Sequence, residues 1–186
     1  MKKILIAMGV VAIAAGAHAA AFNWTASGTN AAKTFYGSDG SSTIAGTTVY
    51  LMDAATVSQN ALVSALRAGG SITDYAATAS QALDANSRLT AQEFSYGEAG
   101  TTYNYYMAVV DGDNVFVSAS ISAYGQASAT SDVKFSGIKT ATQTVFGDAD
   151  YSAAGWYSTA AAVPEPTSGL LLLLGMAGLA LKRKHA

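Results

Sequence analysis

Apolar and polar residues alternate along several short runs in the middle of the chain, a period of two that is typical of β-strands. The clearest run spans residues 103–110, where the odd-numbered side chains share one face and the even-numbered ones the other. The next four residues, DGDN at 111–114, predict a tight turn because Gly and Asn accept the positive φ that such turns require. Alternation resumes at Val115, Val117 and Ala119. The pattern therefore predicts a β-hairpin.

Other short runs of the same kind predict further strands at residues 22–26, 47–53, 89–96, 131–135 and 143–146. Together with the hairpin they make seven or more strands, which favours two packed sheets. The expected fold is mainly β, an antiparallel β-sandwich with one short helix. Residues 71–88 have weak periodicity, and a long loop with a turn or two of helix is expected there.

One segment, TVSQNALVSALRAGG at residues 56–70, departs from the period of two. Its apolar residues recur at helical spacing, and Leu62 and Leu66 are the largest of them. Thr56 or Ser58 can cap the start of a helix, and the two glycines at 69 and 70 can end it. We expect a short helix whose Leu62 and Leu66 face packs on a sheet.

The first residues have the three parts of a secretory signal peptide. Lys2 and Lys3 form the charged start, residues 4–17 are apolar, and Ala17-His18-Ala19 provides the small residues of a cleavage site at Ala17 and Ala19. This pattern predicts a signal peptide at residues 1–19, cut after Ala19 or close to it. Its partners would be a Sec-type export machinery and signal peptidase.

The last residues combine two prolines, an apolar run and a basic end. Pro164, Glu165 and Pro166 favour an extended backbone because proline fixes φ and disfavours helix before it. The expected membrane segment consists of Gly169, Leu170, Leu171, Leu172, Leu173, Leu174, Gly175, Met176, Ala177, Gly178, Leu179, Ala180 and Leu181. As a helix, the fifteen residues 167–181 span about 22 Å. They are fewer than the roughly 20 residues that normally cross a bilayer. Lys182, Arg183 and Lys184 would stay on the cytoplasmic side.

Residues 20–162 thus form the expected ectodomain, and residues 163–186 a separate C-terminal signal. Residues 20–162 contain eleven acidic and five basic residues, a net charge of −6, which argues against nucleic acid as a partner. Both histidines lie in the two end segments, and the chain has no cysteine. These absences exclude disulfides, Cys or His zinc sites and a Ser-His-Asp unit from the ectodomain. We expect no cofactor and no catalytic residue, and we assign no metal ligand.

Carboxylates are the remaining candidates for chemistry, because pairs of Asp or Glu can hydrolyse glycosides. The candidate pairs are Asp111 with Asp113 and Glu93 with Glu98. For the first pair the stronger interpretation is turn chemistry, since Asp bonds its own backbone in tight turns. For the second it is a solvated strand end. Calcium is a further hypothesis, with the oxygen ligands Asp111, Asp113, Asn114, Asp148 and Asp150, although their spacing departs from the known calcium loop.

Aromatic side chains provide a hypothesis of another class, because flat rings can stack on sugars. The available rings are Trp24, Tyr103, Tyr105, Tyr106, Trp156 and Tyr157. The alternative is that these rings form core and cross-strand pairs. An exposed row of rings on one sheet face would distinguish a carbohydrate-binding module from a buried core.

The C-terminal segment closely resembles the PEP-CTERM sorting signal of Gram-negative bacteria, on V-P-E-P at residues 163–166, the short apolar run and the basic end. The resemblance implies an exosortase-type membrane protease that acts at the Pro-Glu-Pro site, transient tethering in the inner membrane, and delivery to the cell surface or an exopolysaccharide matrix. We therefore expect an exported, non-enzymatic structural or interaction protein. The alternatives are a carbohydrate-binding module that contacts extracellular polysaccharide and, with less support, a carboxylate glycosidase.

Overall fold

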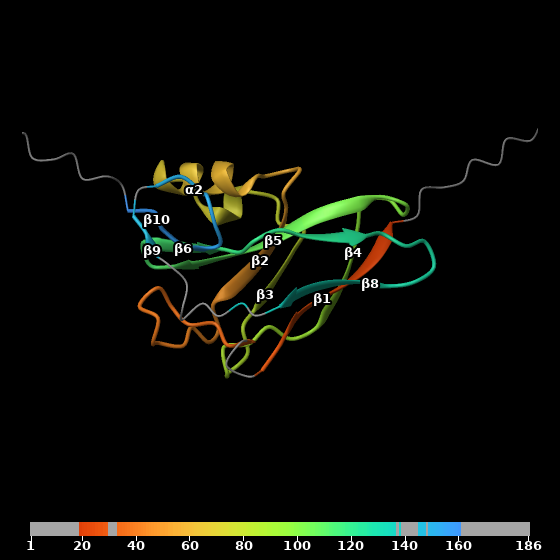
Figure 1. The fold of residues 1–186 in the computed structure, drawn as a ribbon, viewed down its shortest axis with the longest axis horizontal. Helices are drawn as coiled ribbons and strands as arrows, with labels where there is room; N and C mark the ends of the chain where they lie inside the picture. The colour runs from red at the N-terminus through yellow and green to blue at the C-terminus, as the bar shows by residue number, and fades with distance from the viewer. Residues whose placement is uncertain (1–18, 30–32, 137, 139–144, 148, 161–186) are drawn as a thin grey trace, which may run out of the picture.

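The computed structural model describes residues 19–29, 33–136, 138, 145–147 and 149–160, which form two β-sheets and a helix in three layers (Figure 1). The smaller sheet has the order β4 (Gln92–Tyr96), β1 (Ala20–Ser27), β8 (Ser131–Ser136). The larger sheet has the order β3 (Ala79–Ala82), β2 (Thr48–Asp53), β5 (Thr102–Asp111), β6 (Asn114–Val117), β10 (Gly155–Ser158), β9 (Val145–Phe146), with β7 (Ile121–Tyr124) paired to β5. The mainly β prediction is confirmed. The expected signal peptide, apart from Ala19, and the C-terminal helix lie outside the described residues.

The inter-sheet core is formed by the facing sides of the two sheets. Phe22 and Trp24 of β1 are fully buried there, together with Leu51 of β2 and Met107 of β5. Their neighbours along each strand point to the opposite face of the sheet, as the pleat of a strand requires. Burial of these large side chains is the main source of the domain's stability, because the chain has no disulfide.

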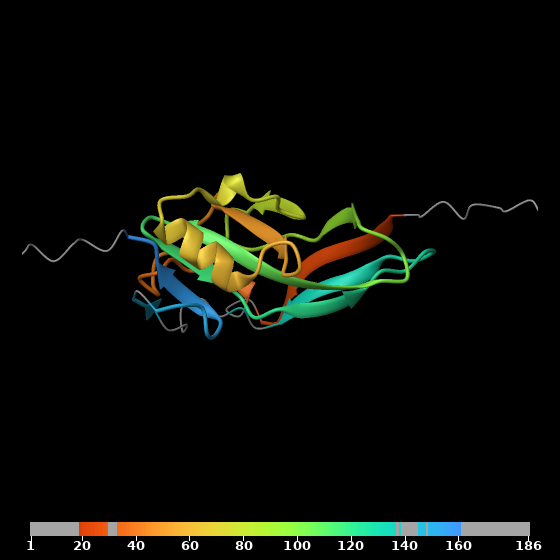
Figure 2. The same cartoon turned by 90° about the horizontal axis from the view of Figure 1, so that it is seen from above.

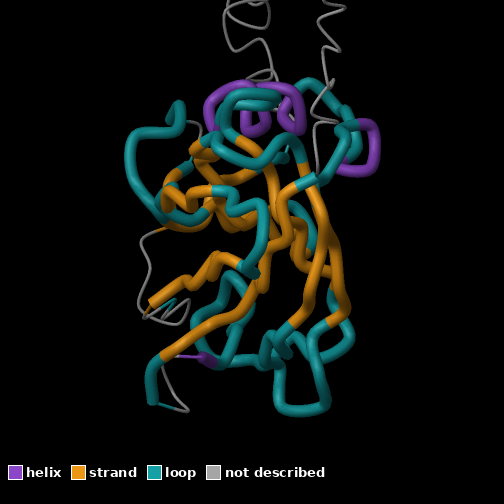
Figure 3. Tube along the Cα trace, turned by 90° about the vertical axis from the view of Figure 1, so that its right-hand side faces the viewer, coloured by secondary structure: helices purple, strands orange, loops and turns teal. Residues whose placement is uncertain are grey.

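A second core lies on the other face of the larger sheet, beneath helix α2 (Gln59–Arg67). Leu62, Val63 and Leu66 of α2 are buried against Tyr106 of β5 and Tyr157 of β10. Figure 2 shows α2 above one half of the larger sheet, and Figure 3 shows the helix stacked over the strands. The predicted Leu62 and Leu66 face is confirmed, and Val63 extends it.

The ends of α2 follow from its sequence. Ser58 is the N-cap, and its side chain accepts a hydrogen bond from the Ala61 backbone N–H. Beyond the helix, Gly69 has a φ of +87°, and its N–H bonds the Leu66 carbonyl. A backbone in this left-handed conformation favours glycine and ends the helix with a sharp turn.

The predicted hairpin is formed by β5 and β6. Asp111 pairs with Asn114, and the two residues between them make the turn. Gly112 has a φ of +54°, which explains why glycine occupies this position. The central part of β5 is buried on both faces, in the inter-sheet core and beneath α2. This double burial explains why β5 has apolar residues on both of its predicted faces.

Three strands were not predicted: β3, β7 and β10. Each has only four residues, too few for a clear period. Two described strand pairs, β1 with β8 and β9 with β10, are parallel, while the others are antiparallel. In the region expected to be a loop, a 3-10 helix at Ile72–Asp74 precedes β3, in line with the expected turn of helix.

Candidate functional site

The sorting residues 163–186 lie outside the described residues, so the candidate site is the end of the domain from which they extend. The last described strand is β10, and the described chain ends two residues beyond it. Figures 1 and 2 place β10 and the start of β1 at opposite ends of the molecule. The chain therefore enters the domain at one end and leaves it at the other.

Strand β10 lies inside the larger sheet. It pairs antiparallel with β6, from Gly155 opposite Val117 to Ser158 opposite Asn114, and parallel with β9 on its other side. Because successive side chains of a strand point to opposite faces, β10 contributes to both cores. Its last residues are consequently part of the folded domain.

Two aromatic residues of β10 anchor it in the two cores. Trp156 is 1% exposed and packs against Phe116, with ring centroids 5.6 Å apart. Tyr157 is fully buried on the other face and stacks on Phe146 at 4.9 Å. Full burial of one such side chain contributes about 1.5–3 kcal/mol. The C-terminal strand is thus held by two large side chains on opposite sides of the sheet.

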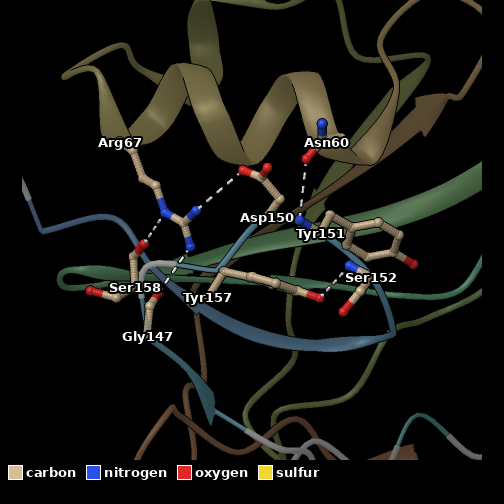
Figure 4. Close-up of polar contacts among 8 residues, drawn as sticks. All are labelled: Asn60, Arg67, Gly147, Asp150, Tyr151, Ser152, Tyr157 and Ser158. Carbon is tan, nitrogen blue, oxygen red and sulfur yellow. Dashed lines mark hydrogen bonds and ion pairs between the residues drawn. The ribbon is translucent and has the colours of Figure 1, made fainter.

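The guanidinium of Arg67, in the last turn of α2, joins the helix to the C-terminal strands (Figure 4). Its Nε donates to the Ser158 carbonyl oxygen at 3.0 Å and its Nη2 to the Gly147 carbonyl oxygen at 2.9 Å. Its Nη1 also lies 3.9 Å from a carboxylate oxygen of Asp150. The planar, forked donor set of arginine suits this arrangement, in which one side chain reaches two backbone carbonyls.

The segment of residues 150–153 is hydrogen-bonded to Tyr157 (Figure 4). The Tyr157 hydroxyl accepts from the backbone N–H groups of Ser152 and Ala153 at 3.1 and 3.2 Å, and donates to the Ala153 carbonyl at 2.6 Å. The Tyr151 N–H donates to Asn60 of α2 at 3.2 Å. Burial and the neighbouring Tyr157 raise the pKa of Tyr151, whose hydroxyl donates to the Ser118 carbonyl.

The chain is fixed one residue beyond β10 as well. The Thr159 backbone N–H donates to the Asp113 carbonyl oxygen at 2.7 Å, in the turn between β5 and β6. A groove of about 250 Å³ lies beside this contact, lined by Leu66, Gly70, Ser71, Ile72, Val110, Gly112 and Thr159. The backbone is therefore tied to the β5–β6 turn at Thr159, three residues before the matched segment begins.

The four carboxylates considered as catalytic pairs, Asp111 with Asp113 and Glu93 with Glu98, differ in exposure and contacts. Asp111 accepts hydrogen bonds from the backbone N–H and the hydroxyl of Ser38, at 3.0 and 3.2 Å, and so holds the loop after β1 against the hairpin. Asp113 is exposed in the turn. Glu93 is exposed on β4, and Glu98 is exposed in the β4–β5 loop. Asp111 therefore has a structural contact, but with Ser38 of a distant loop and not with the backbone of its own turn as expected.

The calcium hypothesis draws no support from the part of the chain that the structure describes. In that part, no group of three Asp, Glu, His or Cys side chains is placed to hold a metal ion. Asp148, one of the five candidate ligands, lies outside it.

The hypothesis of an exposed platform of aromatic rings finds no support in the residues named above. The rings of Trp24, Tyr105, Tyr106, Trp156 and Tyr157 are buried in the two cores. Tyr103 is half-buried, and its hydroxyl bonds the backbone N–H and carbonyl of Glu98. The alternative interpretation, that these rings form core and cross-strand contacts, is confirmed.

Sequence reasoning missed the groups that fix the C-terminal strand, chiefly Arg67 and Asn60. It also missed Asp53, a carboxylate only 6% exposed that accepts from the Tyr96 hydroxyl at 3.0 Å. A single arginine in the last turn of an otherwise uncharged helix was the available signal for Arg67.

Comparison with known proteins identifies the C-terminal segment. Residues 162–184 match the family model described as the PEP-CTERM protein-sorting motif. No curated protein and no solved structure matches the chain. Among the described residues, no helix is long and apolar enough to cross a membrane. The motif implies an exported protein that passes the membrane and is processed by an exosortase-type enzyme. The chain is a protein that carries a PEP-CTERM sorting motif after a mainly β domain.

Proposed function

We propose that this protein is a non-enzymatic surface or extracellular-matrix protein that is held briefly in the inner membrane and then released by cleavage at Pro164-Glu165-Pro166. Signal peptidase would first remove residues 1–19. The single observation that carries the proposal is the family match at residues 162–184, which begins two residues after the last described residue, Ala160. Cleavage in that segment would leave β10 and both cores intact.

A non-enzymatic role is supported by the chemistry of the domain. Residues 20–162 contain neither histidine nor cysteine. The two less exposed carboxylates described above, Asp53 and Asp111, are engaged by tyrosine, serine and backbone donors. Burial of the named rings removes the support for the carbohydrate-binding alternative, and no observation on the described residues favours a glycosidase.

The test compares three forms of the full-length chain in cells that export and process it. In one form Pro164, Glu165 and Pro166 are all replaced by Ala. In the matched control, three exposed residues of the β7–β8 loop, Gln126, Ser128 and Thr130, are replaced by Ala. We expect the motif variant to stay in the membrane fraction with unprocessed mobility, whereas the control behaves as wild type. Normal release of the motif variant would refute the proposed processing.

A further inference from the structure

We propose that one end of the folded domain contacts a basic outer surface of the protease that processes the motif, and this inference rests on the proposed function. We call this end the exit face and define it by Gly69, Gly70, Gly112, Asp113 and Thr159. Its components come from three places in the sequence: the end of α2, the β5–β6 turn and the residue after β10. The hydrogen bond from Thr159 to Asp113 and the groove beside it bring them together.

The length of chain between the domain and the motif carries the inference. The Thr159 backbone is fixed to the β5–β6 turn, and Pro164 follows five residues later. Five residues span at most about 18 Å even when fully extended. A domain of about 140 residues has a radius of gyration near 14 Å, so this connection is shorter than the domain is wide. A protease bound at Pro164 therefore has the folded domain beside it.

The direction in which the domain faces follows from the same connection. Strand β1 begins at the end of the molecule opposite to β10 (Figures 1 and 2). As long as β10 stays folded, Pro164 lies within about 18 Å of Thr159, so the surface around Thr159 is always close to a protease bound there. Unfolding β10 would expose Trp156 and Tyr157, both almost fully buried. The exit face is consequently the part of the domain that meets the protease.

The same arithmetic places the motif near the membrane. The expected membrane segment starts at Gly169, again five residues beyond Pro164. A protease that acts on the motif therefore acts within about 18 Å of the start of that segment. The exit face has two large neighbours in this position, the lipid surface and the outer surface of the protease.

The negative charge of the exit face favours the protease over the lipid surface as its partner. Asp113 is exposed in the turn, and the side chain of Asp150, beside the same end, is 79% exposed. Arg67 offsets the charge of Asp150, with which it pairs at 3.9 Å, and it also donates to the Gly147 and Ser158 carbonyls. Anionic lipids would repel the exposed carboxylate of Asp113. A basic protein surface is complementary to it, and such complementarity acts mainly on the rate of encounter.

The shape of the exit face suits contact with another protein. Its groove is lined by the almost buried Leu66 and Ile72, the half-buried Val110, and Gly70 and Gly112. A Cβ atom added at Gly112 would meet nothing within 4 Å, so the backbone there is open to a partner. A small groove with exposed backbone and polar groups around it can receive a side chain of another protein.

The test measures how fast the C-terminal segment is lost, by pulse-chase labelling of the full-length chain in cells that process it. The variant is Asp113→Lys, with Asp113→Asn as a milder form that preserves the turn. The matched control is Glu93→Lys, an identical charge change at an exposed site on β4 of the smaller sheet. Each form is also made with twelve Gly and Ser residues inserted after Ala160, and thermal unfolding verifies that each domain folds.

We expect Asp113→Lys to slow processing at least about threefold and Asp113→Asn less, since the change acts on encounter with the protease. Glu93→Lys should match wild type, and the inserted linker should abolish the difference. Equal rates for the two lysine variants would overturn the inference. Faster processing of Asp113→Lys would also overturn it, by indicating contact with anionic lipid. Replacing residues 164–166 with Ala in parallel tests the proposed function separately, because normal processing of that form would refute it whatever the exit face does.

Discussion

Arg67 donates a hydrogen bond from its Nε to the carbonyl oxygen of Ser158 at 3.0 Å, which joins the last turn of α2 to the last residue of β10. These residues are 91 positions apart in the sequence. With the second bond to Gly147, one side chain holds the two C-terminal strands against the helix. The folded domain therefore extends almost to the sorting motif.

Removal of this side chain should destabilise the domain. Arg67→Ala leaves the two carbonyl groups without their charged donor, and hydrogen bonds to charged groups contribute about 1.5–3 kcal/mol each to stability. Because the bond to Gly147 is exposed and the one to Ser158 only part-buried, the two contribute less than this sum, and we expect the free energy of unfolding in urea to fall by about 2–3 kcal/mol. Asp150→Ala is the control, because an exposed ion pair contributes about 0–1 kcal/mol. Equal losses in the two variants would show that the carbonyl contacts are unimportant.

Two glycines of similar conformation should respond differently to substitution. Gly97 and Gly46 both have positive φ, +58° and +78°. A Cβ at Gly97 would overlap with the hydroxyl and ring of Tyr103, whereas a Cβ at Gly46 would meet nothing within 4 Å. Strain in the left-handed region costs about 1–2 kcal/mol, and overpacking adds about 1–3 kcal/mol.

We therefore expect Gly97→Ala to lower the unfolding free energy by about 2–4 kcal/mol and Gly46→Ala by about 1 kcal/mol. Chemical denaturation of both variants under identical conditions makes the comparison. If Gly46→Ala is as harmful as Gly97→Ala, the close approach of Tyr103 does not matter.

The domain should lose stability in alkali. Burial raises the pKa of Tyr105 and of Tyr106, with the nearby Asp53 contributing to both shifts. Above pH 10, the ordinary tyrosine pKa, the unfolded chain loses these protons while the folded domain keeps them. The unfolded state then binds fewer protons, so the free energy of unfolding falls as the pH rises. Below pH 10 both states are protonated, and the two groups cause no change.

Absorbance at 295 nm, recorded together with circular dichroism, tests this expectation. Part of the tyrosine signal should titrate only as the β-sheet signal disappears, and in urea all ten tyrosines should titrate together near pH 10. Complete ionisation near pH 10 with the fold intact would be incompatible with the buried positions of Tyr105 and Tyr106.

The position of β10 predicts where the chain can be shortened. A chain of residues 20–160 retains every described strand and should unfold cooperatively. A chain of residues 20–154 lacks Trp156 and Tyr157, which occupy both cores. Loss of an aromatic side chain from a core costs about 3–5 kcal/mol, so the shorter chain should not fold. Thermal unfolding of the two chains, purified alike, compares them, and a cooperative transition in the shorter one would contradict the role of β10.

The elements that could be predicted have strong local signals. The β5–β6 hairpin has both an alternating period and a turn that requires Gly112, and α2 has its cap at Ser58 and glycines beyond its end. Strand β10 has neither signal, since GWYS becomes a strand through its pairing with β6 and β9. Local patterns therefore located the hairpin and the helix but not the strand that closes the domain.

The contacts of the candidate site also depend on residues far apart in the sequence, so local patterns could not predict them. The contacts of Arg67 are to backbone carbonyls 80 and 91 residues away, and such acceptors have no side-chain signature in a sequence. Exposure of the rings could not be read from spacing either, because Trp24 and Trp156 lie on strands whose partners are distant in the chain. The sorting motif was recognisable because its order of residues is itself the signal.

The intact mass of the released protein tests the central claim most directly. The protein is collected from the surface or matrix fraction of cells that export the full-length chain, and both of its ends are assigned by mass spectrometry. Our account predicts a chain that starts at or near Ala20, includes β10, and ends before the apolar run that begins at Gly169. A released protein that still contains residues 169–186 would contradict it.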